Sequence, residues 1–296
     1  MRRGWRMGQV IAAILDPLCA TAYRFPSMAD TSATFTGSIP EYYDRCFGPA
    51  YLDAIMLDLA QRIPVKPPGD VLEIACGTGL LTRRLRERLD PTIRLVATDL
   101  SVAMLDFARA KLGDARNLEW GEADAAKLPF RDGEFGAVVC SFGVMFVPDK
   151  NAAFSEARRV LKEGGILLFN VWDRIEENPH ILANAQVVEG LFPGDMEMRF
   201  RIPYEMYDPA LLRGLLAQAR FEDVRIESKQ VPITGASART IATGQIRGTP
   251  RSLLIEKRGV PLDDVIEKVT AALARIGGAD PYRGVAKSIV VEARRR

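Results

Sequence analysis

The sequence contains few of the residues that build metal sites and disulfide frameworks. Its 296 residues include four cysteines and one histidine. Cys19, Cys46, Cys76 and Cys140 are scattered along the chain, and no two of them form a C-x-x-C pair. This spacing disfavours both a metal site and a disulfide framework, and it indicates a reducing, cytoplasmic setting.

An excess of charge of either sign is also missing. Forty Lys and Arg residues against 38 Asp and Glu residues leave a formal net charge of +2. No overall electrostatic field therefore indicates a nucleic-acid partner. A hydrophobic share of 48% and a charged share of 26% are typical of a globular protein. This length allows a sizeable core, either in one large domain or in one domain with a cap.

A long apolar run is missing from the N-terminal region. The apolar run at residues 10–15 ends at Asp16. It is shorter than a signal-peptide core of about 7–15 residues and far shorter than a membrane span of about 20 residues. We therefore expect residues 1–37 to be a disordered extension without stable membrane insertion, with Met28 as an alternative start of the native protein. A signal peptide cleaved after Ala22 is the competing interpretation.

The central motif of the chain is a short apolar run, a glycine turn and an amphipathic segment. Residues 71–74 are typical of a buried strand, and residues 80–89 carry apolar positions at helical spacing. Gly77 and Gly79 allow a sharp turn and the close approach of a ligand. Together these elements predict the first strand–helix unit of a doubly wound sheet, which binds its ligand at the carboxyl end of the strand.

Three residues near this turn indicate the chemistry of the ligand. A dinucleotide-binding G-x-G-x-x-G loop requires a third glycine at position 82, where the chain has Thr82. Glu73 would repel a pyrophosphate, but it suits a ligand with an ammonium and a sulfonium group. Asp99 ends the next apolar run, where an acidic side chain can accept hydrogen bonds from ribose hydroxyls. An adenosine with a cationic tail and no phosphate is S-adenosyl-L-methionine, which we predict as the cofactor.

These residues resemble the first motif of class I S-adenosylmethionine-dependent methyltransferases, in the small-molecule branch of the ubiquinone/menaquinone biosynthesis C-methyltransferases (methyltransferase domain type 11). That motif is an acidic residue followed by x-Gly-x-Gly-x-Gly, and residues 73–79 match it except that Ala75 replaces the first glycine. The resemblance covers roughly residues 38–175. It implies an α/β fold with a doubly wound, seven-stranded and mostly parallel sheet of order 3-2-1-4-5-7-6, whose last strand is antiparallel, and a helical cap.

Periodicity and turn residues divide the chain into segments. Residues 38–175 are the expected S-adenosylmethionine-binding Rossmann-like core, and residues 176–234 are a cap segment, a helix and the sixth strand. Residues 235–283 are a helical insertion over the substrate site, and residues 284–296 are the final strand and a basic tail. The predicted strands are residues 71–74, 93–99, 117–122, 135–140, 166–172, 221–232 and 285–293. The predicted helices are residues 39–45, 51–60, 80–89, 102–110, 151–160, 179–190, 209–219 and 261–276.

The resemblance also implies which side chains surround the cofactor. Leu100 and Met104 would pack near the adenine, Asp124 would accept a hydrogen bond from the adenine amino group, and Tyr43 would border the methionine end. The competing interpretations are a tyrosine packed between helices and an aspartate that only forms a turn. The predicted cofactor-binding residues are Tyr43, Glu73, Ala75, Cys76, Gly77, Thr78, Gly79, Asp99, Leu100, Met104, Ala123, Asp124, Ala125 and Ser141.

The sequence indicates the catalytic residues only weakly. Methyl transfer from a sulfonium is an in-line displacement in which the protein aligns the reacting groups and excludes water. A base is needed only where the acceptor must lose a proton. His180, the sole histidine, is the candidate base, and Tyr43, Tyr204 and Tyr207 are weaker candidates. A packing or surface histidine is the competing interpretation.

Two segments of the sequence indicate which class of molecule accepts the methyl group. Residues 141–144, Ser-Phe-Gly-Val, stand where methyltransferases acting on adenine or glutamine amides carry an Asn/Asp-Pro-Pro-Tyr-type signature, which disfavours that class. The Met- and aromatic-rich residues 191–207 indicate an apolar pocket or a packing face. We expect methyl transfer to O, C or N of a small, apolar or aromatic molecule. The alternatives are an NAD(P)-dependent oxidoreductase, disfavoured by the lack of a Tyr-x-x-x-Lys pair at Tyr204 or Tyr207, and a non-catalytic S-adenosylmethionine-binding protein.

Overall fold

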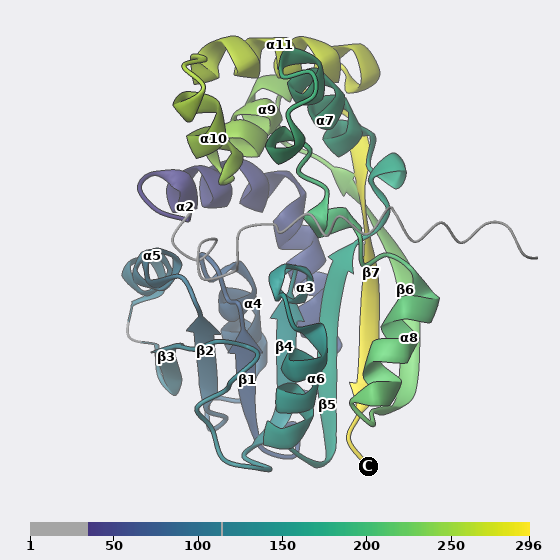
Figure 1. Cartoon of the computed structure of the whole chain (residues 1–296). Helices are drawn as coiled ribbons and strands as arrows, with labels where there is room; N and C mark the ends of the chain where they lie inside the picture. The colour runs from purple at the N-terminus through teal and green to yellow at the C-terminus, as the bar shows by residue number, and fades with distance from the viewer. Residues whose placement is uncertain (1–34, 114) are drawn as a thin grey trace, which may run out of the picture.

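The computed structural model of this protein describes residues 35–113 and 115–296 (Figure 1). The predictions about Met28 and a signal peptide concern residues outside this described part. The strands are β1 (Asp70–Ile74), β2 (Leu95–Asp99), β3 (Leu118–Glu122), β4 (Phe135–Ser141), β5 (Leu161–Trp172), β6 (Glu222–Ile233) and β7 (Gly284–Arg294). They form one seven-stranded sheet of order β3-β2-β1-β4-β5-β7-β6, which confirms the predicted strand order.

The position of each strand in the sheet follows from its composition. Residues 71–74 of β1 and 135–140 of β4 are buried, as expected for parallel strands that are covered on both faces. The edge strand β3 exposes Glu119 and Glu122. β7 pairs antiparallel with both β5 and β6, as predicted. Because β1 to β5 are parallel to one another, their carboxyl ends meet at one edge of the sheet.

β5 begins earlier than the sequence predicts. The prediction starts this strand at Ile166, after a glycine turn, whereas the structure starts it at Leu161. Leu161 is buried and pairs with Phe135 of β4. Gly164 adopts φ +74°, a conformation that favours glycine. The glycines therefore form an irregularity within the strand, because the buried side chain of Leu161 holds the residues before them in the sheet.

Helices cover both faces of the sheet. The helices are α2 (Ile39–Tyr42), α3 (Asp53–Gln61), α4 (Leu80–Arg88), α5 (Val102–Leu112), α6 (Lys150–Val160), α7 (Pro179–Leu191), α8 (Pro209–Gln218), α9 (Ala238–Arg247), α10 (Arg251–Lys257) and α11 (Leu262–Gly277). Ser101 and Asp208 accept hydrogen bonds from backbone N–H groups at the starts of α5 and α8, so both act as N-caps. None of the helices in the described ranges has the length and apolar character that crossing a membrane requires.

A second layer of helices lies over the carboxyl edge of the parallel strands. Figure 1 shows α7, α9, α10 and α11 beyond the ends of β1, β2, β4 and β5. The two helices predicted near the N-terminus are joined by a π-helical segment, Tyr43–Leu52, which packs against α9. The chain therefore closes the ligand-binding edge of the sheet with segments that are more than 180 residues apart in the sequence.

Candidate functional site

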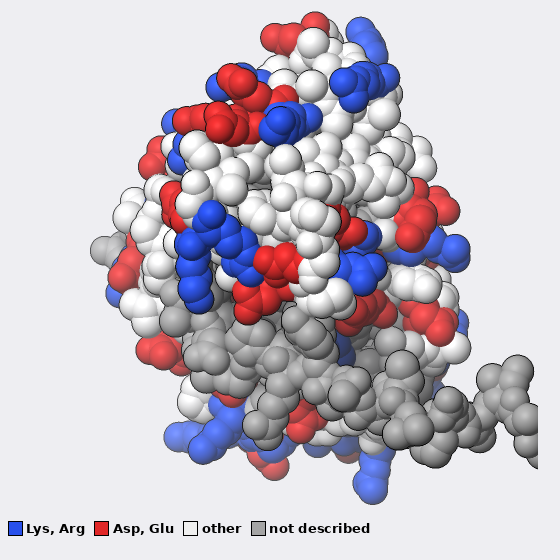
Figure 2. All heavy atoms as spheres, turned by 45° about the horizontal axis from the view of Figure 1, so that its top comes forward, with Lys and Arg blue, Asp and Glu red and all other residues white. Residues whose placement is uncertain are grey.

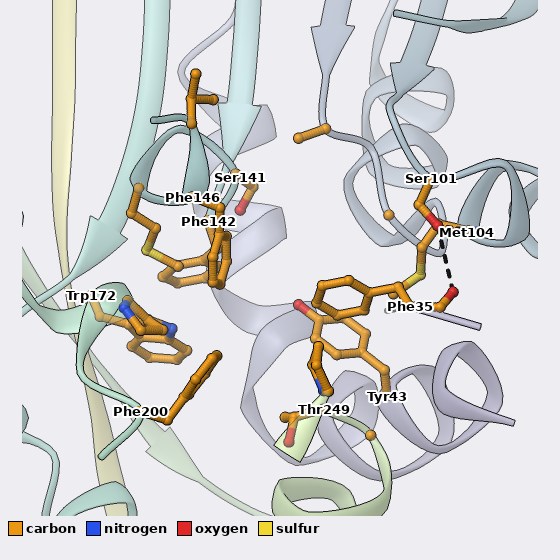
Figure 3. Close-up of a pocket in the computed structure, with 18 of the residues that line it drawn as sticks. Phe35, Tyr43, Ser101, Met104, Ser141, Phe142, Phe146, Trp172, Phe200 and Thr249 are labelled. Atoms are coloured by element: carbon orange, nitrogen blue, oxygen red, sulfur yellow. Dashed lines mark hydrogen bonds between the residues drawn. The ribbon is translucent and has the colours of Figure 1, made fainter. Parts of the chain in front are cut away.

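A cavity of about 720 Å³ lies between the carboxyl edge of the sheet and the helical layer. Its size is within the range of small-molecule sites, about 300–1,000 Å³. Figure 3 shows Phe35, Tyr43, Ser101 and Met104 on one side of the cavity and Phe142, Phe146, Trp172 and Phe200 on the other. We call the first part, with the glycine turn and the ends of β1 to β3, the glycine-turn end. We call the part around the four other aromatic side chains the aromatic end.

The glycine turn leaves space for a ligand. Gly77 has φ +55°, and a Cβ atom placed on it would meet nothing within 4 Å. Gly79 has φ +76° and lies against α5, where an added Cβ would approach the Leu112 side chain to 2.9 Å. Ala75 also has a positive φ, 54°, at the position where the family motif has its first glycine. Gly77 therefore faces the cavity, while Gly79 closes the turn against the neighbouring helix.

Asp99 connects the glycine turn to the end of β2. Its Oδ2 accepts a hydrogen bond of 2.8 Å from the backbone N–H of Gly77, and its Oδ1 accepts one of 2.8 Å from that of Ser101. Burial raises the pKa of Asp99, and the backbone donors oppose this rise. Each carboxylate oxygen has a further lone pair, so Asp99 can also accept hydrogen bonds from a ligand in the cavity.

The third strand contributes a second carboxylate to the cavity. Asp124, in the loop after β3, lines the wall together with Ala123 and Ala125. Its Oδ1 accepts a hydrogen bond of 2.8 Å from the N–H of Ala126. Asp124 therefore forms a turn and also lies on the cavity wall.

Most of the residues predicted to bind the cofactor line this cavity. They are Tyr43, Ala75, Gly77, Asp99, Leu100, Met104, Ala123, Asp124, Ala125 and Ser141. Tyr43 is the first of three aromatic residues of the π-helical segment, four residues apart, that all reach the wall; the others are Phe47 and Tyr51. The structure therefore brings together residues from five predicted segments.

Glu73, Cys76, Thr78 and Gly79 do not line the cavity. Glu73 points into the packed interior from β1 and is only 1% exposed. Its Oε2 has no hydrogen-bond partner among the described residues. Burial raises the pKa of Glu73 to about 8, so the side chain is mostly protonated at neutral pH. The sequence predicts a Glu73 carboxylate that faces the ligand, whereas in the structure this side chain is buried and does not line the cavity.

The candidate base His180 is not on the cavity wall either. Its ring is fully buried beside Tyr51, with the ring centroids 5.2 Å apart, and neither ring nitrogen has a hydrogen-bond partner in the described part of the chain. Burial lowers the pKa of His180 to about 3, which keeps the ring neutral. Tyr207 is 38% exposed and also lies off the wall. Tyr204 lines the cavity, and burial raises its pKa to about 12.

Sequence reasoning missed most of the aromatic end. Phe142 stacks on Trp172, with ring centroids 4.2 Å apart and an angle of 19° between the planes (Figure 3). Phe142 has φ 53°, and Asn170 Oδ1 accepts a hydrogen bond of 3.1 Å from its backbone N–H. Strained residues of this kind cluster at functional sites. The rule that ligands bind at the carboxyl ends of parallel strands could have identified Phe142 and Trp172.

The helical layer contributes polar residues to the same wall. Asn184 of α7, Gln245 of α9 and Arg251 of α10 each line the cavity and are each 5% exposed. No sequence motif marks them, since they are far apart in the chain and meet only through helix packing. No cluster of three His, Cys, Asp or Glu residues suited to a metal ion occurs in residues 35–113 and 115–296.

Comparison with known proteins identifies the part of the chain that holds the glycine turn. A family model described as a methyltransferase domain matches residues 72–169. The ubiquinone/menaquinone biosynthesis C-methyltransferase UbiE of Ectopseudomonas mendocina is 43% identical over 107 residues, which are 35% of this chain and 42% of that protein. UbiE of Saccharophagus degradans is 43% identical over 101 residues, 33% of this chain and 41% of that protein. The chain thus matches about two fifths of the length of these relatives.

Solved structures with low sequence identity share the fold. Phosphoethanolamine N-methyltransferase 2 of Haemonchus contortus, in complex with S-adenosyl-L-methionine, has a TM-score of 0.58 at 17% identity, covering 92% of this chain and 60% of that one. The [4+2]-cyclase SpnF has a TM-score of 0.58 at 17% identity, covering 91% and 97%. A cyclase with this fold illustrates that a fold does not define a reaction. Residues 72–169 thus match a methyltransferase domain, and the strand order of the sheet is the one implied by the resemblance to class I S-adenosylmethionine-dependent methyltransferases.

Proposed function

We propose that this protein transfers the methyl group of S-adenosylmethionine to an O, C or N atom of a small, apolar or aromatic molecule. The observation that carries this proposal is that the glycine-turn end and the aromatic end belong to one continuous cavity. Its glycine-turn end has backbone space and two carboxylates, and its aromatic end is mostly apolar. A cofactor and an acceptor bound at these ends would lie next to each other, as a direct transfer requires.

At the glycine-turn end we assign the cofactor contacts to residues of the wall. Asp99 would accept hydrogen bonds from the ribose hydroxyls and Asp124 one from the adenine amino group, because carboxylates are acceptors only. Gly77 would allow the methionine part to approach the backbone, and Leu100 and Met104 would pack on the adenine. The other proposed contacts are Tyr43, Ala75, Ala123, Ala125 and Ser141. We assign Glu73, Cys76, Thr78 and Gly79 to the support of the turn.

The bound cofactor would supply an electrophilic methyl group on its sulfonium. This chain's own residues would orient the acceptor and exclude water around the reacting atoms. Tyr51 and Tyr204 are protonated at neutral pH, as phenols ordinarily are, and burial raises the pKa of both further. Asp149, also on the wall, caps α6 by accepting a hydrogen bond from the N–H of Ala152. We therefore expect an acceptor that is nucleophilic without the help of a strong base.

We propose the same division of labour for the segments of the chain. Residues 38–175 would hold the cofactor, residues 176–234 would form a cap segment, a helix and the sixth strand, and the helical insertion of residues 235–283 would lie over the acceptor. The cytoplasmic setting indicated by the scattered cysteines is part of this proposal; Cys46, Cys76 and Cys140 are free thiols.

Calorimetry and a transfer assay test this function. We expect the purified protein to bind S-adenosylmethionine and S-adenosylhomocysteine, and not NAD or NADP. Radiolabelled methyl groups should then move to some members of a panel of aromatic phenols, amines, enols and acids. Binding of a nicotinamide dinucleotide in place of S-adenosylmethionine would favour an oxidoreductase. Binding of S-adenosylmethionine without transfer to any panel member would favour a non-catalytic protein or a different reaction.

A further inference from the structure

A buried arginine stands on the wall of the aromatic end. Arg251 lies in the first turn of α10, lines the cavity and is 5% exposed. One of its terminal nitrogens donates a hydrogen bond of 3.3 Å to Asn184 Oδ1. Its guanidinium carbon lies 5.3 Å from the centre of the Phe200 ring. Its Nε has no hydrogen-bond partner among the described residues. The cation thus has donor capacity that the protein itself leaves unused.

The charge of Arg251 is not neutralised by a neighbouring carboxylate. No ion pair within 4.0 Å joins it to an Asp or Glu of the described ranges. Glu189, the nearby acidic residue on α7, pairs instead with Arg201 at 2.6 Å. Burial lowers the pKa of Arg251 to about 10, which still leaves it charged at neutral pH. An unpaired buried cation costs free energy, so its position on a cavity wall indicates a partner that enters the cavity.

Two amide side chains accompany Arg251. Asn184 and Gln245 line the same cavity and are buried. Gln245 donates a hydrogen bond of 3.1 Å to the backbone oxygen of His180, while its own Oε1 has no partner in the described part of the chain. Buried polar groups are almost always paired, so unpaired ones on the wall of a cavity point to ligand contacts. These polar groups come from three different helices, α7, α9 and α10.

We propose that the acceptor carries a carboxylate on its apolar or aromatic body and that Arg251 binds this carboxylate. The planar guanidinium matches the two oxygens of a carboxylate better than a compact ammonium group does. Asn184 orients the guanidinium, and the Phe200 face supports it from the side. This inference rests on the proposed function, because it assigns the aromatic end to the acceptor.

The charges on the outer face of the helical layer do not favour an anionic acceptor over a neutral one. Figure 2 shows Lys, Arg, Asp and Glu side chains mixed over the outer face of the helical layer, without a field of one sign. The net charge of +2 is also small for a chain of this length. Discrimination between an anionic acceptor and its neutral analogue therefore depends on the residues inside the cavity, and above all on Arg251.

Matched ligand pairs test the proposal. Calorimetry on the protein saturated with S-adenosylhomocysteine compares 2-naphthoate with 2-naphthamide, and phenylacetate, indole-3-acetate and decanoate with their amides. We expect at least one carboxylate to bind about tenfold or more tightly than its amide, since hydrogen bonds to charged groups are the strong ones. In Arg251→Met this preference should disappear while amide binding remains. Arg251→Lys should keep part of it.

The control is Arg247→Met, which removes an arginine of the neighbouring helix that pairs with Asp263 and does not line the cavity. It should leave the carboxylate preference unchanged. Equal affinity for both members of every pair, or no carboxylate binding at all, overturns the proposal. Failure of the wild-type protein to bind S-adenosylhomocysteine would instead overturn the proposed function. If Arg251→Met does not fold, the wild-type preference and Arg251→Lys still decide the question.

Discussion

The two ends of the cavity are built in different ways. Apart from Phe35 and Tyr43, the glycine-turn end consists of short stretches at and just after the carboxyl ends of β1, β2 and β3. The aromatic end combines Phe142 after β4 and Trp172 at the end of β5 with two residues from the later part of the chain. These are Phe200, between α7 and α8, and Arg251 of α10. The first end uses mainly backbone space and carboxylates, and the second uses side-chain shape and one buried cation. Under the proposed function, cofactor binding is encoded by local stretches of sequence, and acceptor choice is encoded by the packing of distant segments.

The largest effect is expected from a substitution that disrupts the glycine-turn end alone. In Gly77→Val, a β-branched side chain at φ +55° would project into the open space of the cavity. We expect no measurable heat of S-adenosylmethionine binding in calorimetry. Gly164→Val is the control, because Gly164 has φ +74°, open space around it and a position away from the cavity. If both variants lost binding, unfolding would explain the effect of Gly77→Val.

A somewhat smaller effect is expected at Asp99. Asp99→Ala removes the carboxylate that holds the N–H groups of Gly77 and Ser101 and that would accept the ribose hydroxyls. We expect affinity for S-adenosylhomocysteine to fall about 100-fold, since each hydrogen bond to a charged group contributes about 1.5–3 kcal/mol. Asp99→Asn, which keeps one oxygen acceptor, should lose less. An unchanged titration for Asp99→Ala would remove Asp99 from the cofactor site.

A substitution at the aromatic end should weaken acceptor binding and leave cofactor binding unchanged. Phe200→Ala removes a half-buried ring from the cavity wall. We expect binding of aromatic acceptors or analogues to weaken about tenfold, because burying an aromatic side chain contributes about 1.5–3 kcal/mol. S-adenosylhomocysteine binding, measured in the same preparation, should stay within about twofold of wild type. A parallel loss of cofactor affinity would mean that the two ends are not separable.

A close contact behind the turn predicts a moderate loss of stability. A Cβ atom on Gly143 would lie 2.3 Å from the Cβ of Ala75 and 2.9 Å from Cys140 Sγ. Gly143→Ala should therefore lower the free energy of unfolding by about 1–3 kcal/mol. In Gly190→Ala the added methyl group meets nothing within 4 Å, so this helical variant should gain up to about 1 kcal/mol. Denaturant titration measures the free energy of unfolding of both variants. Equal values for the two variants would contradict the prediction.

A pH dependence of stability is expected from the buried Glu73 side chain. The ordinary pKa of the carboxyl is 4.5, and burial raises the pKa of Glu73 in the folded protein to about 8. The unfolded chain thus releases this proton at lower pH than the folded protein, so stability declines as the pH rises from about 4.5 through about 8. Glu73→Gln should lack this part of the decline. Thermal unfolding of both proteins between pH 5 and pH 9 measures it, and parallel curves would show that Glu73 does not contribute.

Local sequence signals predicted most of the sheet and most of the glycine-turn end. Apolar runs such as residues 71–74 and 135–140 specify buried strands, and the caps Ser101 and Asp208 mark helix starts, because these signals act within a few residues. The strand order was predicted from the family resemblance, and the structure confirms it. The burial of Glu73 was not predicted, since the chemistry of a residue does not show how far the fold encloses its side chain.

The family resemblance predicted the strand order, while the sequence by itself determined the buried strands, the glycine turn and the motif that indicates the cofactor. These features rest on the short-range conformational needs of glycine, on strand periodicity and on a motif of neighbouring residues. Only the tertiary structure decided that His180 is shut off from the cavity and that Arg251 joins Phe200 on its wall. The physical reason is that burial and long-range helix packing, which set the surroundings of both side chains, depend on residues distant in the chain.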